Sequence, residues 1–258
     1  MSFLADLFGK SCVIYGEPGV GKTYVMTELA RTLYEATGYR ALFYWSDENL
    51  IDSEYGEEVR KRSQAKVIVI RSIDSLIMHI RSQLKRWQDD VKKQKPVEVS
   101  MIVIDSITGF FEEEYGMTTK AVVSPYVTAK LSRATSIITK DLTKIARLLR
   151  IPTFVITHDT PEFEGEWFGE KRRPAYVRKG LKNTDIWILQ TKRDTVVEKE
   201  IEENGETKII REPVERNYWK VLMYRSMEKK HRGMTYCFQE ELKKFKKELQ
   251  INAKKKAR

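Results

Sequence analysis

The sequence has few cysteine and histidine residues and no long apolar segment. Of its 258 residues, two are cysteine, Cys12 and Cys237, and three are histidine. They form no C-x-x-C pair or Cys/His cluster, so we expect neither a zinc site nor reactive thiols, and both cysteines stand in apolar runs that predict burial. No apolar stretch approaches the roughly 18 residues of a membrane span. Residues 1–10 lack a secretory signal pattern, so we expect a cytoplasmic protein without a membrane partner.

Positive charge is in excess. The chain has 47 Lys and Arg residues against 37 Asp and Glu residues, and a formal net charge of +10. A basic surface favours polyanions such as nucleic acid or anionic lipid, but charge alone identifies neither. The length is that of one large α/β domain, or of one domain with small additions, and it allows a substantial core.

The run GEPGVGKT, Gly16–Thr23, fits the phosphate-binding pattern G-x-x-x-x-G-K-[ST]. The apolar run Ser11–Tyr15 before it predicts a strand, and apolar residues at helical spacing predict a helix over Thr23–Tyr39. A strand that enters a glycine loop and then a helix directs backbone N–H groups toward phosphates. We expect ATP here, with Lys22 at the β- and γ-phosphates and the Thr23 hydroxyl on Mg²⁺. The predicted nucleotide-binding residues are Gly16, Glu17, Pro18, Gly19, Val20, Gly21, Lys22, Thr23 and Tyr24.

Apolar runs alternate with amphipathic segments along the first two thirds of the chain. The predicted strands are Ser11–Tyr15, Ala41–Trp45, Lys66–Ile70, Met101–Ile104, Thr153–Thr157 and Asp185–Gln190. Beyond the helix after the glycine loop, helices are predicted over Ile73–Trp87 and Tyr126–Leu149. Continuous apolar runs are typical of strands that are covered on both faces. The alternation therefore predicts an α/β fold, with a mostly parallel twisted sheet and helices on both faces.

The pattern changes after the sixth predicted strand. Further strand-like runs are Thr195–Glu200, Thr207–Arg211, Tyr218–Tyr224 and Met234–Phe238. The pair Asn204-Gly205 between the first two predicts a two-residue hairpin, and hence an antiparallel extension of the sheet. We expect residues 1–240 to form the core domain. The lysine-rich segment 241–258 is expected to be a helix or tail, either frayed or adding nonspecific affinity for polyanions.

Two carboxylates that follow predicted strands complete a candidate ATPase site. The apolar run MIVID ends at Asp105, the position from which a carboxylate steadies the Mg²⁺ shell beside a P-loop. The strand Ala41–Trp45 leads into the acidic run 46–49 (SDEN) at the carboxyl edge of the sheet, where ligands bind. A carboxylate there can polarise the attacking water. Glu48 is our candidate, Asp47 is its rival, and a helix N-cap is the structural alternative.

The blocks GEPGVGKT, FYWSDEN and VIDSIT occur in this order and together resemble the RecA/RadA/RadB superfamily of recombinase-type ATPases. The similarity to archaeal RadA proteins extends to DSITGFFEEEYG (105–116), the long helix after it and TFVITHDT (153–160), and covers about residues 10–240. The resemblance implies a RecA-like P-loop NTPase core. It also implies Mg-ATP hydrolysis that is stimulated by DNA or depends on assembly, in recombination, repair or replication support.

The resemblance assigns further roles. Glu48 matches the family's catalytic carboxylate, beside the P-loop Lys22. Thr157, His158 and Asp159 match a strand-end Thr-Asn-Gln that senses the γ-phosphate, although His and Asp replace the usual Asn and Gln. Arg225 matches an arginine that reaches ATP on the next subunit, as in RecA-like and KaiC-like domains. It implies a homo-oligomer with ATP-bridged interfaces and a third catalytic residue; a surface arginine is the alternative.

Two loops contact DNA in the family that the chain resembles. The first corresponds to FFEEEY (110–115), where Glu112 replaces a basic residue and would repel phosphate; its aromatic side chains, Phe110 among them, either stack on bases or anchor the loop. The second lies near residues 163–180. Its basic and aromatic residues suit single-stranded DNA, and an ordinary solvated loop is the alternative. The candidate contacts are Lys171, Arg172, Arg173, Tyr176, Arg178 and Lys179.

Two other interpretations use the same core. A KaiC-like signalling ATPase or autokinase would act through protein partners, without affinity for DNA. A regulatory recombinase paralogue that scarcely hydrolyses ATP is favoured by Glu112 and by Met223, which stands where a lysine is common. The P-loop begins at Gly16, which predicts that the N-terminal DNA-binding domain and linker of RadA are missing. This truncation resembles RadB-like paralogues, which implies a full-length recombinase as a partner, in a cellular or viral setting.

Overall fold

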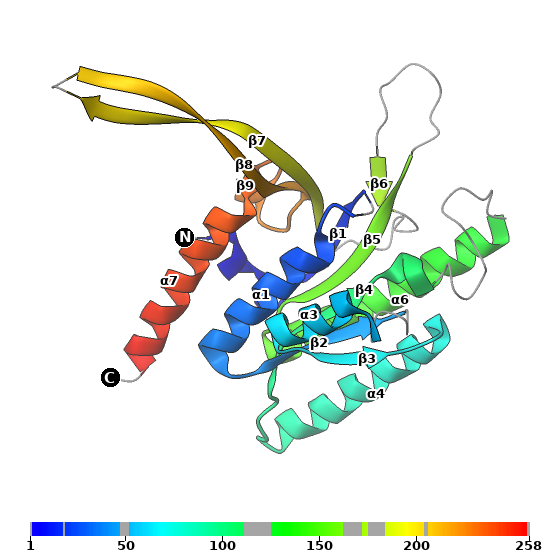
Figure 1. Ribbon diagram of the computed structural model, residues 1–258. Helices are drawn as coiled ribbons and strands as arrows, with labels where there is room; N and C mark the ends of the chain where they lie inside the picture. Colours follow the sequence, from blue (N-terminus) through cyan, green and yellow to red (C-terminus); the bar gives the residue numbers. More distant parts are fainter. Residues whose placement is uncertain are drawn as a thin grey trace.

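Figure 1 shows a computed structural model of the chain. The structure describes residues 2–17, 19–46, 52–110, 125–161, 172–174, 184–203 and 206–256. The strands are β1 (Ser11–Gly16), β2 (Arg40–Trp45), β3 (Lys66–Val69), β4 (Val99–Asp105), β5 (Thr153–Pro161), β6 (Arg172–Pro174), β7 (Asp185–Glu203), β8 (Glu206–Arg225) and β9 (Thr235–Cys237). The helices are η1 (Phe3–Leu7), α1 (Lys22–Thr37), α3 (Glu54–Ser63), α4 (Ile73–Lys92), α6 (Pro125–Leu149), η2 (Lys229–His231) and α7 (Phe238–Lys256).

The strands form a mostly parallel sheet. From one edge their order is β3-β2-β4-β5-β1-β7-β8-β9, and β6 pairs with the end of β5. The first six strands of this order run parallel, whereas β8 and β9 are antiparallel to their neighbours. Parallel neighbours need crossover connections, which the helices provide. The sheet confirms the predicted α/β class and its antiparallel extension.

Two hydrophobic cores lie on opposite faces of this sheet. Ile14 belongs to the core that includes residues of η1, α1 and α7, whereas its neighbour Val13 belongs to the core that includes residues of α4 and α6. Successive strand residues point to opposite faces, so a strand between two cores is buried on both faces and consists mainly of apolar residues. All six residues of β1 are buried, as this arrangement requires.

The second half of the sheet differs from the sequence prediction. Each of the two pairs of short strands predicted between residues 185 and 224 is one long strand, β7 or β8, and the separate strands were wrong. The polar residues after Gln190 suggested an end to the strand. Instead, the register shifts between Asp194 and Val196, and the ladder continues past this irregularity to Glu203. The two strands extend from the core as an arm (Figure 1). The hairpin residues Asn204 and Gly205 lie outside the described residues.

Helix α3 was not predicted from the sequence. Its segment, EYGEEVRKRS, contains Gly56 and has Val59 as its one buried large apolar residue, so it shows little hydrophobic periodicity. The helix is defined by its ends instead. The Ser53 hydroxyl accepts a hydrogen bond from the Gly56 amide, and Gln64 ends the helix in a left-handed conformation with φ of 54°.

The two ends of the chain pack against the same side of the core. Phe3, Leu4 and Leu7 of η1 are buried, so they cover this chain's own core. Helix α7 contributes Leu242 and Phe245 to the same core. Both cysteines are free thiols. Across the described ranges, no helix has the length and apolarity needed to cross a membrane.

Candidate nucleotide-binding site

The glycine loop lies between the end of β1 and the start of α1. Gly19 and Gly21 have φ of 77° and 93°, a backbone region that favours glycine. Side chains are also excluded by space at two positions. A Cβ at Gly16 would lie 2.6 Å from the carbonyl oxygen of Leu189, and one at Gly21 would lie 2.5 Å from Nε1 of Trp219. The loop therefore requires glycine at these positions for its shape.

Lys22 folds back over this loop. Its Nζ donates hydrogen bonds of 2.8 Å to the carbonyl oxygens of Gly16 and Glu17, and only 6% of the residue is exposed. A buried ammonium needs such partners, because desolvation without them is costly. The amine is thus held at the loop, where an anion that replaced the two carbonyls would form stronger, charge-assisted hydrogen bonds.

Thr23 and Asp105 meet beside the loop, although they are 82 residues apart in the sequence. Thr23 Oγ1 donates a hydrogen bond of 2.6 Å to Oδ2 of Asp105, at the end of β4. Burial raises the pKa of Asp105, and the hydrogen bond from Thr23 and the charge of Lys22 offset only part of this effect. A carboxylate and a hydroxyl are hard oxygen ligands, which suit Mg²⁺.

These two oxygens fit a magnesium ion better than a metal whose coordination shell is filled by protein side chains alone. Within the described ranges, no group of three or more His, Cys, Asp or Glu residues could hold a metal ion. Magnesium commonly takes one or two protein oxygens and completes its shell with water and substrate phosphate. Thr23 and Asp105 would supply the protein ligands of such a site.

The end of β5 lies between the glycine loop, which follows β1, and Asp105, which ends β4. β5 is the strand between β1 and β4, and in its register Thr157 pairs with Tyr15 and His158 pairs with Gly16. Thr157 is fully buried. Asp159 is already beyond the sheet's main body and pairs with Pro174 of β6. The backbone of the candidate sensor residues therefore runs directly past the start of the glycine loop.

Several predicted site residues lie outside the described residues. They are Pro18, Asp47, Glu48, Lys171, Tyr176, Arg178 and Lys179. The strand before Glu48 is described, and its last residue, Trp45, pairs with Asp105. The chain thus enters the segment that contains Glu48 from a point beside Asp105.

The backbone also places the predicted arginines. Arg172 and Arg173 form β6, where they pair with Pro161 and Thr160 of β5. Arg225 pairs with Ile186 near the start of β7. It therefore lies toward the side of the sheet where the parallel strands begin, which we call the amino edge, and away from its own glycine loop at the carboxyl edge, where these strands end. A role for Arg225 in ATP hydrolysis would therefore require a neighbouring subunit.

Phe110 has a structural role. Its side chain is fully buried in the core under α4 and α6. It cannot stack on a base from that position, so of the two alternatives for this residue the anchoring role is correct. Phe111 and Glu112 lie outside the described residues.

Trp219 contacts the glycine loop, which the sequence did not suggest. Its Nε1 donates a hydrogen bond of 2.8 Å to the carbonyl oxygen of Val20, 199 residues away, and its ring stacks on Tyr24 with centroids 4.7 Å apart. The same ring occupies the space beside Gly21. Strand β8 is therefore joined directly to the loop. No short motif around Trp219 carries this information.

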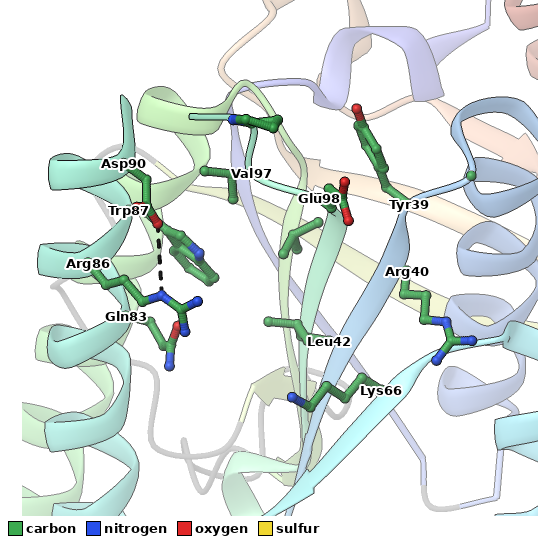
Figure 2. A pocket seen from close by; sticks show the side chains of 13 residues that line it. Tyr39, Arg40, Leu42, Lys66, Gln83, Arg86, Trp87, Asp90, Val97 and Glu98 are labelled. Carbon is green, nitrogen blue, oxygen red and sulfur yellow. Dashed lines mark ion pairs between the residues drawn. The ribbon is translucent and has the colours of Figure 1, made fainter. Parts of the chain in front are cut away.

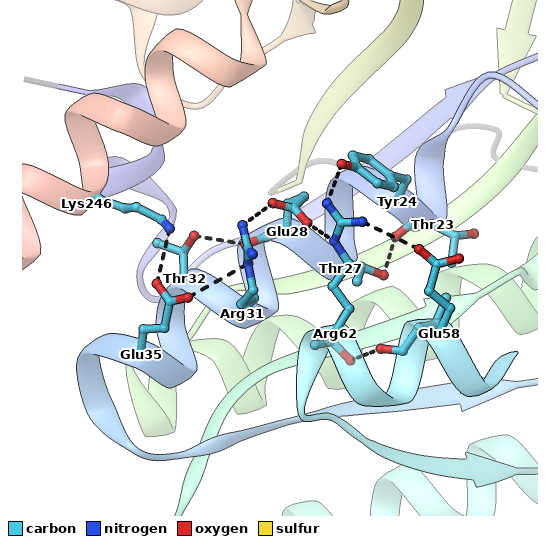
Figure 3. Close-up of polar contacts among 12 residues, drawn as sticks. Thr23, Tyr24, Thr27, Glu28, Arg31, Thr32, Glu35, Glu58, Arg62 and Lys246 are labelled. Carbon is cyan, nitrogen blue, oxygen red and sulfur yellow. Dashed lines mark hydrogen bonds and ion pairs between the residues drawn. The ribbon is translucent and has the colours of Figure 1, made fainter. Parts of the chain in front are cut away.

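Helix α3 is joined to the same region through α1 (Figure 3). Arg62 donates hydrogen bonds of 2.5 Å to Glu28 and 2.6 Å to the Tyr24 hydroxyl, and its guanidinium lies 4.7 Å from the centre of the Tyr24 ring. These contacts hold α3 against the first turns of α1. β2 and α3, the described elements that precede and follow residues 47–51 in the chain, are thus both held beside this region.

Tyr55 is a further residue at this site. It is 46% exposed, and its hydroxyl lies close enough to the Thr23 side chain and the Asp105 carboxylate for both to affect its pKa. Burial raises the pKa of Tyr55, the neighbouring Thr23 side chain opposes the rise, and the negative charges of Asp105 and Glu58 add to it. Tyr55 therefore remains a neutral hydrogen-bonding group beside the Thr23–Asp105 pair at neutral pH.

Two sequence comparisons with known proteins found no match. No protein-family model matches the chain, and a search of curated proteins found no similar sequence. A functional assignment therefore rests on the residues and contacts described above.

Proposed function

We propose that this protein is a RecA-type ATPase that binds Mg-ATP at the glycine loop and supports DNA recombination, repair or replication. One observation carries the proposal: the hydrogen bond between Thr23, the first residue after the P-loop lysine, and Asp105, at the end of a buried strand. A glycine loop alone also occurs in ordinary turns. A loop joined to a strand-end carboxylate has the two oxygens that hold Mg²⁺ in P-loop enzymes.

The strand order gives additional support. β5 lies between the strand of the glycine loop and the strand of Asp105. This order is compatible with a RecA-like core, in which the inserted strand senses the γ-phosphate. The Thr157–Asp159 end of β5 continues into its pairing with β6, which contains Arg172 and Arg173. A change at the phosphate could thus reach a basic segment through one strand.

Different residues of the chain would serve phosphate binding, magnesium binding and hydrolysis. Loop N–H groups and Lys22 would bind the β- and γ-phosphates, with Lys22 exchanging its two carbonyl partners for phosphate oxygens. Thr23 and Asp105 would hold Mg²⁺, which, when bound, neutralises charge on these phosphates. Glu48 would orient the attacking water and accept its proton. Arg225 of a neighbouring copy would stabilise the negative charge that develops on the phosphate.

The catalytic assignment is tested with Glu48→Gln. The amide cannot accept the proton, so we expect turnover to fall by about 100-fold or more while ATP binding is retained. Asp47→Asn is the matched control, because it removes the adjacent carboxylate. Loss of turnover in Asp47→Asn but not in Glu48→Gln would identify Asp47 as the catalytic base.

The assignment to DNA metabolism is tested by the steady-state ATPase rate at low salt, with and without single-stranded DNA. We expect several-fold stimulation, and we expect neutralisation of Arg172 and Arg173 to reduce both the stimulation and the salt dependence of DNA binding. An ATPase rate that is independent of DNA would favour the KaiC-like alternative, with protein partners. A very low rate that a full-length recombinase raises would indicate the regulatory paralogue.

A further inference from the structure

A pocket lies at the amino ends of β2, β3 and β4, on the side of the sheet opposite the glycine loop. It has a volume of about 510 Å³ and is formed where β2, β3 and β4 begin, against the second half of α4. β2 starts beside the pocket at Arg40 and ends beside Asp105 at Trp45. The pocket and the nucleotide site are thus at opposite ends of the same strands. Its volume is within the range of about 300–1,000 Å³ that is typical of small-molecule sites.

Two cations extend into this pocket from opposite walls. Lys66 comes from the start of β3 and Arg86 from α4, and Figure 2 shows both side chains directed into the space between them. Among the described residues, Lys66 forms no ion pair. Arg86 forms an ion pair with Asp90, whose Oδ2 lies 3.8 Å from Nε, and 72% of the Arg86 side chain is exposed. Two cations on facing walls repel each other unless an anion lies between them.

The charge of Lys66 also acts on a neighbouring group. Burial lowers the pKa of His79, and the positive charge of Lys66 lowers it further.

The remaining walls combine an apolar surface with polar groups, among them the carboxylates of Asp90 and Glu98. The Trp87 indole, which is 5% exposed, and the side chain of Leu42 face the space between α4 and the sheet. Gln83 lies one turn of α4 before Trp87, near Arg86. Its amide can donate hydrogen bonds to an anion. Flat apolar groups together with a few convergent polar groups are typical of sites for small organic ligands.

We propose that this pocket binds a small organic anion. A phosphate or carboxylate group would lie between Lys66 and Arg86, with Gln83 as an additional donor, and a flat apolar body would pack on Trp87 and Leu42. The anion would remove the repulsion between the two cations and form charge-assisted hydrogen bonds with both. The site does not depend on the proposed ATPase function, because it shares no residue with the glycine loop.

The test uses phenyl phosphate as the probe and the indole N–H signal of Trp87 as the readout. The chain has five tryptophans, so a protein labelled with ¹⁵N at its indoles gives few signals, and Trp87→Phe assigns the relevant one. We expect a saturable shift of the Trp87 signal. In Lys66→Ala/Arg86→Ala, the affinity should fall by about tenfold or more, because two charged partners are lost. Lys85→Ala/Lys92→Ala removes two charges from α4 outside the pocket lining and should change the affinity by less than about twofold.

Three results with phenyl phosphate would overturn the proposal. The first is a Trp87 signal that phenyl phosphate does not move, and the second is equal affinity in Lys66→Ala/Arg86→Ala. The third is loss of the shift in Lys22→Ala, because the response would then come from the glycine loop; persistence in Lys22→Ala supports the pocket even if the ATPase proposal fails. Phenol tests the anion requirement, and inorganic phosphate tests the apolar requirement. Either one binding as tightly as phenyl phosphate would contradict the proposed ligand class.

Discussion

The two edges of the sheet present their charges in different ways. At the carboxyl edge, Lys22 and Asp105 already have close partners within the chain, at 2.6–2.8 Å. At the amino edge, Lys66 forms no ion pair with a described residue, and Arg86 forms only the longer pair with Asp90, at 3.8 Å. A ligand at the carboxyl edge would replace hydrogen bonds that these side chains now form within the chain. An anion at the amino edge would add contacts that Lys66 and Arg86 do not form without it. Closely paired and loosely paired charges thus each point to a binding site, for different physical reasons.

The largest expected difference between the two edges is in ATP turnover, and Asp105→Asn tests it. The amide keeps the size of the side chain and an acceptor for Thr23, but it lacks the charge that holds Mg²⁺. We expect ATP turnover to fall by about 100-fold or more. Asp90→Asn is the control at the other edge, beside Arg86, and should leave turnover unchanged.

The same variant should not destabilise the fold. Burial raises the pKa of Asp105, so the ionised carboxylate is less favourable in the folded chain than in the unfolded chain. Without nucleotide at pH 7, Asp105→Asn should therefore have an unfolding free energy equal to that of the wild type or about 1 kcal/mol higher, as measured in urea. A clear loss of stability would show that the charge of Asp105 holds the site together.

An intermediate effect is expected from tryptophan substitutions at the two edges. Trp219→Phe keeps the stacking on Tyr24 but removes the hydrogen bond to Val20, so ATP affinity should fall by about fivefold, or about 1 kcal/mol. Trp87→Phe at the amino edge should leave ATP affinity unchanged. Calorimetric titration of both variants with Mg-ATP measures the difference. Equal losses in the two variants would indicate that the edges are not independent.

The smallest effect on ATP binding is expected from a region at neither edge, the contact of α7 with η1. Burial alone would raise the pKa of Glu241, but hydrogen bonds from Lys244, the Phe3 amide and Ser2 outweigh it, so the pKa lies below its ordinary value of 4.5. Since the folded-state pKa is depressed, Glu241 stabilises the fold above the unfolded-state pKa, and this contribution is lost as the pH falls through the folded-state value.

Glu241→Gln should therefore lose about 1 kcal/mol of unfolding free energy at pH 7, and less near pH 3, without a change in ATP affinity. Urea unfolding at the two pH values provides the measurement. A change in ATP affinity would show that the packing of α7 against η1 affects the glycine loop.

Contiguous patterns predicted the elements that form the carboxyl edge. The buried strands were recognised because each is a continuous apolar run, and the first turn of α1 follows directly from the glycine loop. The predicted strand ending before Asp105 is found as the end of β4. Such features depend on neighbours in the sequence, so sequence patterns reveal them.

The features that sequence patterns missed depend on residues far apart. α3 has little apolar periodicity and is held by contacts such as Arg62 with Glu28. The contact between Trp219 and Val20 joins residues 199 positions apart. The amino-edge pocket takes Lys66 and Arg86 from separate elements. No local pattern specifies which of many polar residues will meet in this way.

The central claim is that the glycine loop, and not the basic surface in general, binds ATP. Calorimetric titration of Lys22→Ala and Lys66→Ala with ATP in the presence of Mg²⁺ tests it most directly, because each variant removes one lysine, from opposite edges of the sheet. We predict that Lys66→Ala binds as the wild type does and that Lys22→Ala binds about tenfold more weakly or not at all. Unchanged ATP affinity in Lys22→Ala would contradict the proposed nucleotide site.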